Sequence, residues 1–510
     1  MQVVYLIQRK RQRTGHEKGA AFACVRFEEG KELYDVVIIG CGVTGAAAAY
    51  ELSKLQVSVM ILEKENDVAM GTSRANSAII HAGYDAPSGT LMARLNVEGN
   101  AMAEDLCKAL DVPFKRIGSL VAAFDDYDEG VVRDLYERGI RNGVPGIRII
   151  GPEETKKIEP NIAENVRCAL YAPTAGIINP WEYTIALAET AVRNGAQLMR
   201  NAEVTAIART QDGYCVTTTA GDVQAKYVVN AAGVFADKVH EMLLPPAFEI
   251  VPVRGEYDLL DRSEGTRCNT VVFQCPGPEG KGVLVSPTVH GNLIVGPSAE
   301  EIPDREDTAT TAEVLAKVRE RAKRAIPSVD LRQCIRNFAG VRANSRVDDF
   351  ILLEEDGFVD LAGIKSPGLT AAPAIAKYAV ELLRKAGLDA PEKEDFINER
   401  HVVHFAELDA EEQKALIEKN PAYGRVICRC NTVTEGEILD AIHSPIPPVS
   451  VDGIKRRCIT GMGRCQGGFC GPRIVDILAR ELHTDPSKIV QDGTGSYILT
   501  GETKQGGERA

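Results

Sequence analysis

Four cysteines near the C-terminal end have the spacing of a metal site. The motifs CRC and CQGGFC supply Cys428, Cys430, Cys465 and Cys470. Four thiolates can bind either a structural zinc ion or a [2Fe–2S] cluster. Structural zinc pairs usually have at least two residues between the cysteines, so the single residue between Cys428 and Cys430 favours the cluster. Zinc and unliganded thiols remain the alternatives.

The residues around these cysteines bear on the same question. Nearby glycines would let backbone N–H groups approach cluster sulfurs and tune its potential; they are Gly461, Gly463, Gly467, Gly468 and Gly471. Cys458 is a fifth nearby cysteine, which we expect not to be a ligand. The basic run 455–457 either stabilises an anionic cluster or forms a solvated face.

Three other side chains suit the oxidation of a small anionic substrate. His81 lies in the glycine-flanked segment IIHAG, and a neutral imidazole can accept a hydroxyl proton. Arg254 in VPVRGEYDLL and Arg342 in NFAGVRANS each follow an expected strand, and a guanidinium binds phosphate or carboxylate. The alternatives are a structural hydrogen bond for the histidine and a surface ion pair for each arginine. Tyr257 either lines the same site or belongs to the core.

A glycine motif near the start predicts a dinucleotide site. The apolar run 36–39 is typical of a buried parallel strand, and it is followed by Gly40, Gly42 and Gly45 and then an alanine-rich segment. Gly40 would permit the tight turn, Gly42 the approach of a pyrophosphate, and Gly45 close packing of helix on strand. The positive end of the helix dipole would face the phosphates.

A second strand, in VSVMILEKE, ends at Glu63 and Lys64. Glu63 lies at about the distance from the glycines at which an acidic residue binds ribose hydroxyls. Further along, the apolar runs of 280–302 predict an antiparallel hairpin with His290 exposed in its turn.

Composition narrows the class of protein. The chain has 510 residues, 44% hydrophobic, and a net charge of −13, which argues against a nucleic-acid partner. No run reaches the ~20 apolar residues of a membrane span, so we expect at most peripheral membrane contact. Thirteen cysteines in a chain too long for a small secreted disulfide scaffold indicate a protein of the reducing cytoplasm. Any peripheral membrane contact of the protein is expected at the inner face of the membrane. Residues 1–32 are expected to be a disordered extension.

The order of the segments resembles the D-amino-acid-oxidase-like superfamily of FAD oxidoreductases over 34–385. The quoted segments include the polar loop AMGTSRANSAIIHAGYD, a strand centred on Val204, the strand of AKYVVNAAG, and a strand, turn and helix from about Ala371. The resemblance implies an α/β Rossmann-like FAD domain made of discontinuous segments, with an inserted α+β substrate domain. It further implies FAD contacts at Thr72, Ser73, Val204, Gly233, Gly368, Leu369 and Thr370.

The resemblance also implies domain boundaries. The expected units are FAD segments 33–105, 175–245 and 335–385, substrate-domain segments 106–174 and 246–334, a linker 386–422 containing a short helix, a [2Fe–2S] domain 423–500, and a tail 501–510.

The C-terminal motifs resemble the bacterioferritin-associated-ferredoxin-like [2Fe–2S] domain, a small α-rich unit. Together the two parts resemble the anaerobic glycerol-3-phosphate dehydrogenase large subunits. This implies oxidation of glycerol 3-phosphate with His81 as base and with Arg254 and Arg342 on the phosphate. Because a [2Fe–2S] centre accepts single electrons, it indicates a dehydrogenase that passes electrons to a second flavoprotein, another acceptor subunit or quinone. The alternatives are an L-2-hydroxyglutarate or other 2-hydroxy acid dehydrogenase, an amino-acid or amine dehydrogenase, and an electron-transfer subunit without its own substrate.

Overall fold

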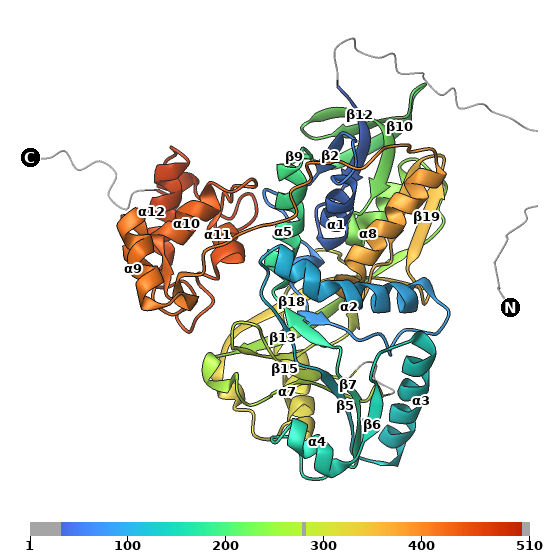
Figure 1. Ribbon diagram of the computed structural model, residues 1–510, viewed down its shortest axis with the longest axis vertical. Helices are drawn as coiled ribbons and strands as arrows, with labels where there is room; N and C mark the ends of the chain where they lie inside the picture. The colour runs from blue at the N-terminus through green and yellow to red at the C-terminus, as the bar shows by residue number, and fades with distance from the viewer. Residues whose placement is uncertain (1–31, 278–281, 502–510) are drawn as a thin grey trace, which may run out of the picture.

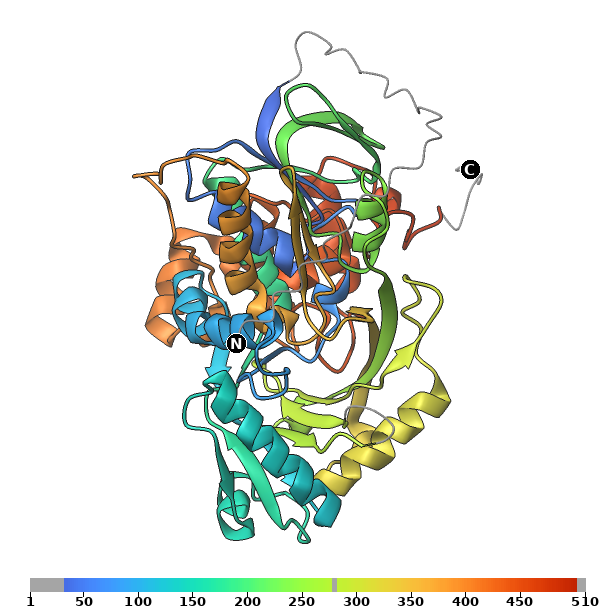
Figure 2. The same cartoon turned by 90° about the vertical axis from the view of Figure 1, so that its right-hand side faces the viewer.

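The computed structural model describes residues 32–277 and 282–501. The extension expected over 1–32 and the tail expected over 501–510 lie outside these ranges except for their innermost residues, 32 and 501. Figure 1 shows two sheets, one above the other, with the C-terminal domain beside the upper one. Figure 2 shows how helices α3 (Asp126–Asn142) and α7 (Ala312–Ala325) flank the lower sheet.

The upper sheet has a parallel centre in the order β20–β12–β1–β2–β9. Strand β1 is buried on both faces, as its β-branched sequence predicts, with Val36, Val37 and Ile38 fully inaccessible. The expected strand around Val204 begins at that residue instead of centring on it. The strands of this sheet are β1 (Leu33–Ile39), β2 (Val59–Leu62), β9 (Gln197–Met199), β10 (Val204–Arg209), β11 (Tyr214–Thr218), β12 (Gly221–Asn230), β19 (Ile351–Glu355) and β20 (Phe358–Ala362).

Helices α1 (Val43–Leu52), α5 (Pro180–Arg193) and α8 (Gly368–Lys385) pack together beside this sheet (Figure 1). Residues 46–49 of α1 are four fully buried alanines, whose small side chains allow α5 and α8 to approach closely. Helix α8 begins at Gly368, earlier than the expected Ala371, because the chain turns into the helix directly after Pro367.

The lower sheet is largely antiparallel, and it includes the hairpin expected in 280–302. Strand β18 pairs with β13 over its whole length, so residues 335–345, expected in an FAD segment, belong to this sheet. The strands are β5 (Ser119–Ala123), β6 (Arg148–Ile150), β7 (Cys168–Ala172), β13 (Ile250–Leu260), β14 (Val271–Gln274), β15 (Leu284–Pro287), β16 (Leu293–Gly296), β17 (Glu300–Glu301) and β18 (Cys334–Ser345). Smaller elements are β3 (Ile79–Ile80), α2 (Leu91–Ala109), β4 (Phe114–Arg116), α4 (Pro152–Ile158), β8 (Gly176–Ile178) and α6 (Ala236–Glu241).

The C-terminal domain has its own core and begins earlier than expected. Phe405 stacks on Tyr423, which moves the start of the domain from 423 to about 405. The preceding segment is fixed to the upper domain, where Arg400 forms a buried ion pair with Glu189 at 2.9 Å. The elements of the domain are α9 (Ala410–Lys419, the expected short helix), β21 (Val426–Cys428), β22 (Val433–Thr434), α10 (Glu435–Ile442), α11 (Val451–Cys458) and α12 (Gly471–Glu481). Among the helices of 32–277 and 282–501, none has the length and apolar character to cross a bilayer.

Candidate active site and metal centre

A cavity of about 540 Å³ lies between the two sheets at the carboxyl ends of β1 and β2. In open parallel sheets this edge is where cofactors bind. Most of the residues singled out in the sequence line the cavity; they are Gly40, Gly42, Glu63, Lys64, Thr72, Ser73, His81, Val204, Gly233, Arg342, Gly368 and Leu369. Gly45, Thr370 and Arg254 do not line it.

The glycine turn leaves no room for side chains. Gly40 has a φ of +96°, and a Cβ there would lie 2.6 Å from the Ala231 carbonyl oxygen. A Cβ at Gly45 would lie 2.0 Å from the Gly40 carbonyl oxygen, so Gly45 lets α1 pack on the turn without contacting the cavity. The N-terminus of α1 therefore opens onto the cavity, with its partial positive charge suited to phosphate.

Glu63 is buried beside this turn. Its carboxylate accepts hydrogen bonds from the N–H of Cys41 at 2.8 Å and of Glu65 at 3.0 Å, and burial raises its pKa. A carboxylate has further acceptor positions, which fits a ribose hydroxyl. Lys64 at the rim forms an ion pair with Glu306 and lies over the ring of Phe235, 4.5 Å from its centroid.

Helix α8 begins at the opposite end of the cavity, with Gly368 and Leu369 in its wall. No side chain in the described part of the chain caps this helix, so the positive end of its dipole faces the cavity. Thr370 has a different position: its hydroxyl accepts the N–H of His81 at 2.8 Å. It thereby fixes the loop that carries the histidine.

His81 projects into the cavity near the start of α8. Its Nε2 lies 3.2 Å from the hydroxyl of Ser366, and its carbonyl accepts a hydrogen bond from Asn100. Ser366 was not singled out in the sequence; the signal was its place two residues before Gly368, in a segment already assigned to the cofactor. The Ser366 hydroxyl therefore marks a position from which a hydroxyl group can hydrogen-bond to this ring nitrogen.

The two arginines point in opposite directions. Arg342 pairs in register with Val253, and Arg254 with Val341, so they lie on opposite faces of one ladder. Arg342 faces the cavity over Gly255, where a Cβ would lie 2.3 Å from its Nη2. Its Nη2 donates to the Ser298 carbonyl at 3.2 Å, and within the described residues it forms no ion pair.

Arg254 does not reach the cavity, contrary to expectation. It is buried against three carboxylates, with Asp307 at 2.6 Å, Glu300 at 3.3 Å and Glu256 at 3.4 Å. These ion pairs compensate the charge of Arg254, so the expectation that it binds the substrate is wrong.

The four cysteines form two pairs. Cys430 and Cys465 are exposed with their sulfurs 3.7 Å apart, close to the ~3.8 Å between two thiolates on one tetrahedral metal with bonds of about 2.3 Å. Cys428 and Cys470 form a second, buried pair in hydrogen-bond contact. Two pairs suit two irons. Gly463 provides space, since a Cβ there would lie 2.9 Å from the Cys430 sulfur.

Backbone N–H groups approach these sulfurs, as the glycine content predicts. A hydrogen bond from Cys470, with further ones from the N–H groups of Asn431 and Gly461, lowers the pKa of Cys428 to about 6. Such groups favour thiolates and would stabilise a bound cluster. Cys458 lies apart from the four, with its sulfur 3.5 Å from the Glu437 carbonyl oxygen.

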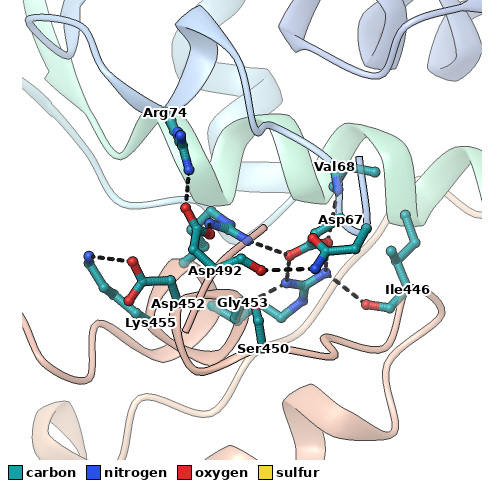
Figure 3. Close-up of polar contacts among 12 residues, drawn as sticks. Asp67, Val68, Arg74, Ile446, Ser450, Asp452, Gly453, Lys455 and Asp492 are labelled. Atoms are coloured by element: carbon teal, nitrogen blue, oxygen red, sulfur yellow. Dashed lines mark hydrogen bonds and ion pairs between the residues drawn. The ribbon is translucent and has the colours of Figure 1, made fainter. Parts of the chain in front are cut away.

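The basic run 455–457 is neither a solvated face nor a partner of the cluster. Arg456 and Arg457 are buried and form ion pairs with Asp67 of the upper domain, while Lys455 pairs with Asp452 (Figure 3). Asp67 had no recognisable signal in the sequence. The run therefore attaches the C-terminal domain to the upper domain.

Comparisons with known proteins agree with this arrangement. Residues 35–382 match the model of the FAD dependent oxidoreductase family, and residues 426–480 match the BFD-like [2Fe-2S] binding domain. A glycerol 3-phosphate dehydrogenase of Caloramator mitchellensis is 49% identical over 92% of this chain and 99% of its own length. The mitochondrial L-2-hydroxyglutarate dehydrogenase of Mus musculus is 28% identical over 67% of this chain and 87% of its own.

A solved structure extends the comparison. The FAD-bound, dithionite-reduced L-alpha-glycerophosphate oxidase of Mycoplasma pneumoniae superposes with a TM-score of 0.69 at 34% identity, over 73% of this chain and 99% of its own. The lined cavity and the paired cysteines fit the two cofactors that these families bind. The chain belongs to the FAD dependent oxidoreductase family and carries, after that domain, a BFD-like [2Fe-2S] binding domain.

Proposed function

We propose that the protein is a dehydrogenase that oxidises sn-glycerol 3-phosphate to dihydroxyacetone phosphate and exports the electrons through its [2Fe–2S] centre. The observation that carries this proposal is that His81 and Arg342 face one cavity and that Arg342 forms no ion pair within the described residues. A base and an uncompensated guanidinium are what a phosphorylated alcohol requires. The high identity to the Caloramator relative over almost the whole chain supports the choice of substrate.

Arg342 binds the phosphate and so places the carbinol carbon within the cavity. His81 accepts the hydroxyl proton at Nε2, where the substrate hydroxyl takes the place that the Ser366 hydroxyl occupies at 3.2 Å. The bound FAD supplies the acceptor for the hydride that leaves the same carbon. The uncapped start of α8 stabilises negative charge at its end of the cavity.

The exposed cysteine pair indicates where electrons leave. Phe469 adjoins Cys470 and lies under two guanidiniums, with Arg429 4.4 Å and Arg473 4.8 Å from the ring centroid. This surface beside Cys430 and Cys465 would receive the acceptor, a second flavoprotein, another electron-acceptor subunit or a quinone system, with at most peripheral contact to a membrane. The [2Fe–2S] centre would supply one-electron transfer between the flavin and this acceptor.

The test is an anaerobic visible spectrum of the purified protein before and after glycerol 3-phosphate. Loss of the flavin band together with partial loss of the broader iron–sulfur absorbance is the expected result. A second candidate, L-2-hydroxyglutarate, has the carboxylate that Arg342 would also bind and is the substrate named for a relative. If L-2-hydroxyglutarate or an amino acid bleaches the flavin and glycerol 3-phosphate does not, the substrate assignment is wrong.

A further inference from the structure

A second cavity, of about 310 Å³, lies between the upper domain, the end of the lower sheet and the C-terminal domain. Its walls come from the start of α5, from β13 and β18, and from the segment 459–462 next to the cysteine motifs. Residues 74–76 and Ala78 line both cavities. We call it the interdomain cavity. Its volume is within the range of small-molecule sites.

The interdomain cavity is cationic in an acidic protein. Its lining has five cationic side chains, namely Arg74, Arg262, Arg336, Lys455 and Arg456, against two carboxylates, Asp452 and Asp492. The chain as a whole has a net charge of −13. Arg262 and Arg336 are exposed at the cavity, and in the described part of the chain neither has an acidic partner. Such a local excess of positive charge favours an anion.

The inner end of the cavity is rigid. Arg456 is 3% exposed and is fixed by Asp67 at 3.0 Å and by Asp492 at 2.7 Å, and Arg74 pairs with the same Asp492 (Figure 3). The Nε of Arg456 is buried without a hydrogen-bond partner among the described residues. Lys455 is 8% exposed, and burial lowers its pKa.

Part of the remaining wall is apolar and aromatic, between asparagine and threonine side chains. Trp181 lines the cavity, with its Nε1 donating to the Arg74 carbonyl at 2.7 Å, and Phe338 lies across from β13. His290, expected to be exposed, is half-buried here, 3.0 Å from Asn179, and burial lowers its pKa to about 4. A wall that holds a neutral imidazole and two aromatic side chains suits a flat ring and not a bare inorganic ion.

We propose that the interdomain cavity is a binding site for a phosphate-bearing organic anion with a planar ring, separate from the substrate site. Arg262, Arg336 and the Arg456 end contact the phosphate, and the Trp181 wall contacts the ring. Because the occupant would touch both domains, its binding is thermodynamically linked to docking of the cluster domain.

The test uses the FAD-saturated full-length protein and two probes, adenosine 5′-monophosphate and inorganic phosphate, with affinities measured by calorimetric titration at fixed ionic strength. We expect saturable binding of adenosine 5′-monophosphate, tighter than that of phosphate. The double variant Arg262→Gln with Arg336→Gln should lower the affinity for adenosine 5′-monophosphate by about tenfold or more. The reason is that one charge-assisted hydrogen bond contributes a factor of about ten or more to an affinity.

The matched control is Arg133→Gln with Arg141→Gln, which removes the same charge from exposed positions on α3 that line neither cavity. Arg342→Gln tests separation from the substrate site and should leave the titration unchanged. The proposal is overturned if adenosine 5′-monophosphate does not bind saturably, if it binds no tighter than phosphate, if the control pair lowers affinity equally, or if Arg342→Gln abolishes binding. None of these outcomes depends on the identity of the oxidised substrate.

Discussion

Arg457 of the C-terminal domain and Asp67 of the upper domain form a buried, two-fold hydrogen-bonded ion pair, with Nη1–Oδ2 and Nη2–Oδ1 distances of 2.9 Å (Figure 3). Asp67 lies between Glu63 and Thr72 in the loop that lines the FAD cavity. Burial alone would raise the pKa of Asp67, but Arg457 and Arg456 lower it to about 2. The pair therefore joins docking of the cluster domain to the cofactor loop.

Asp67→Asn should loosen this attachment. The change removes the close carboxylate of the buried Arg457 and one of the two carboxylates that Arg456 contacts; breaking a buried pair in this way typically costs about 3–5 kcal/mol. Scanning calorimetry should show a lower unfolding temperature, and limited proteolysis should cleave the segment 386–404 faster. Glu313→Gln is the control, because its pair with Lys317 is solvent-exposed and within one helix. Equal behaviour of the two variants would contradict the assignment.

His81→Asn should slow flavin bleaching by glycerol 3-phosphate by about 10²–10⁴-fold, because the general base is lost, while substrate affinity changes little. Anaerobic stopped-flow absorbance measures both quantities. Ser366→Ala should have a smaller effect, since it removes a hydroxyl next to Nε2 and leaves the base in place. A rate for His81→Asn within about tenfold of wild type would leave His81 a structural role.

Arg342→Gln should raise the KM for glycerol 3-phosphate by about a hundredfold and reduce the preference over unphosphorylated glycerol, because a charge-assisted contact is lost. Steady-state assays with both alcohols measure this effect. Arg254→Gln is the comparison. It removes a cationic partner of the fully buried Glu256, so it should lower the free energy of unfolding by about 3 kcal/mol without changing KM. If Arg254→Gln raised KM and Arg342→Gln lowered only the stability, Arg254 and not Arg342 would be the residue that binds the phosphate.

Cys458→Ser should retain the cluster, whereas Cys430→Ser and Cys428→Ser should lose it. The Cys458 sulfur contacts a carbonyl oxygen, and burial raises its pKa, which disfavours the thiolate that a metal needs. Iron analysis and the visible spectrum report the outcome. Iron loss in Cys458→Ser with retention in Cys430→Ser would show that the ligand set includes the fifth cysteine.

Glu182→Gln should stabilise the protein increasingly as pH rises. Glu182 is 3% exposed, and burial raises its pKa to about 8 from 4.5. Between these two values the folded state retains a proton that the unfolded state releases, so wild-type stability falls as pH rises, by at most about 1.4 kcal/mol per pH unit. The glutamine keeps the acceptor for Asn179, which donates at 3.0 Å. Thermal unfolding at pH 5 and pH 8, with exposed Glu411→Gln as control, measures the difference; a pH-independent difference would contradict it.

Local patterns in the sequence predicted the upper sheet and most of the cavity. A G-x-G-x-x-G turn between strand and helix has steric requirements that few other folds share, and Gly40 and Gly45 meet them. The two cysteine motifs likewise indicated the ligand set, but the pairs that form, Cys430 with Cys465 and Cys428 with Cys470, join one motif to the other and come from the tertiary structure. The glycine-turn prediction depends on residues close together in the chain, where geometry follows from sequence.

Only the tertiary structure decided which distant side chains meet. Arg254 and Arg342 read alike in the sequence, but their register in one antiparallel ladder places one against three carboxylates and the other in the cavity. From the sequence, the basic run 455–457 could be a solvated face or a partner of the cluster. In the packed structure, Arg456 and Arg457 of this run form ion pairs with Asp67 of the upper domain. The face on which a side chain lies depends on strand pairing, and the partner of a charge depends on domain docking. Both are set by contacts between segments far apart in the chain.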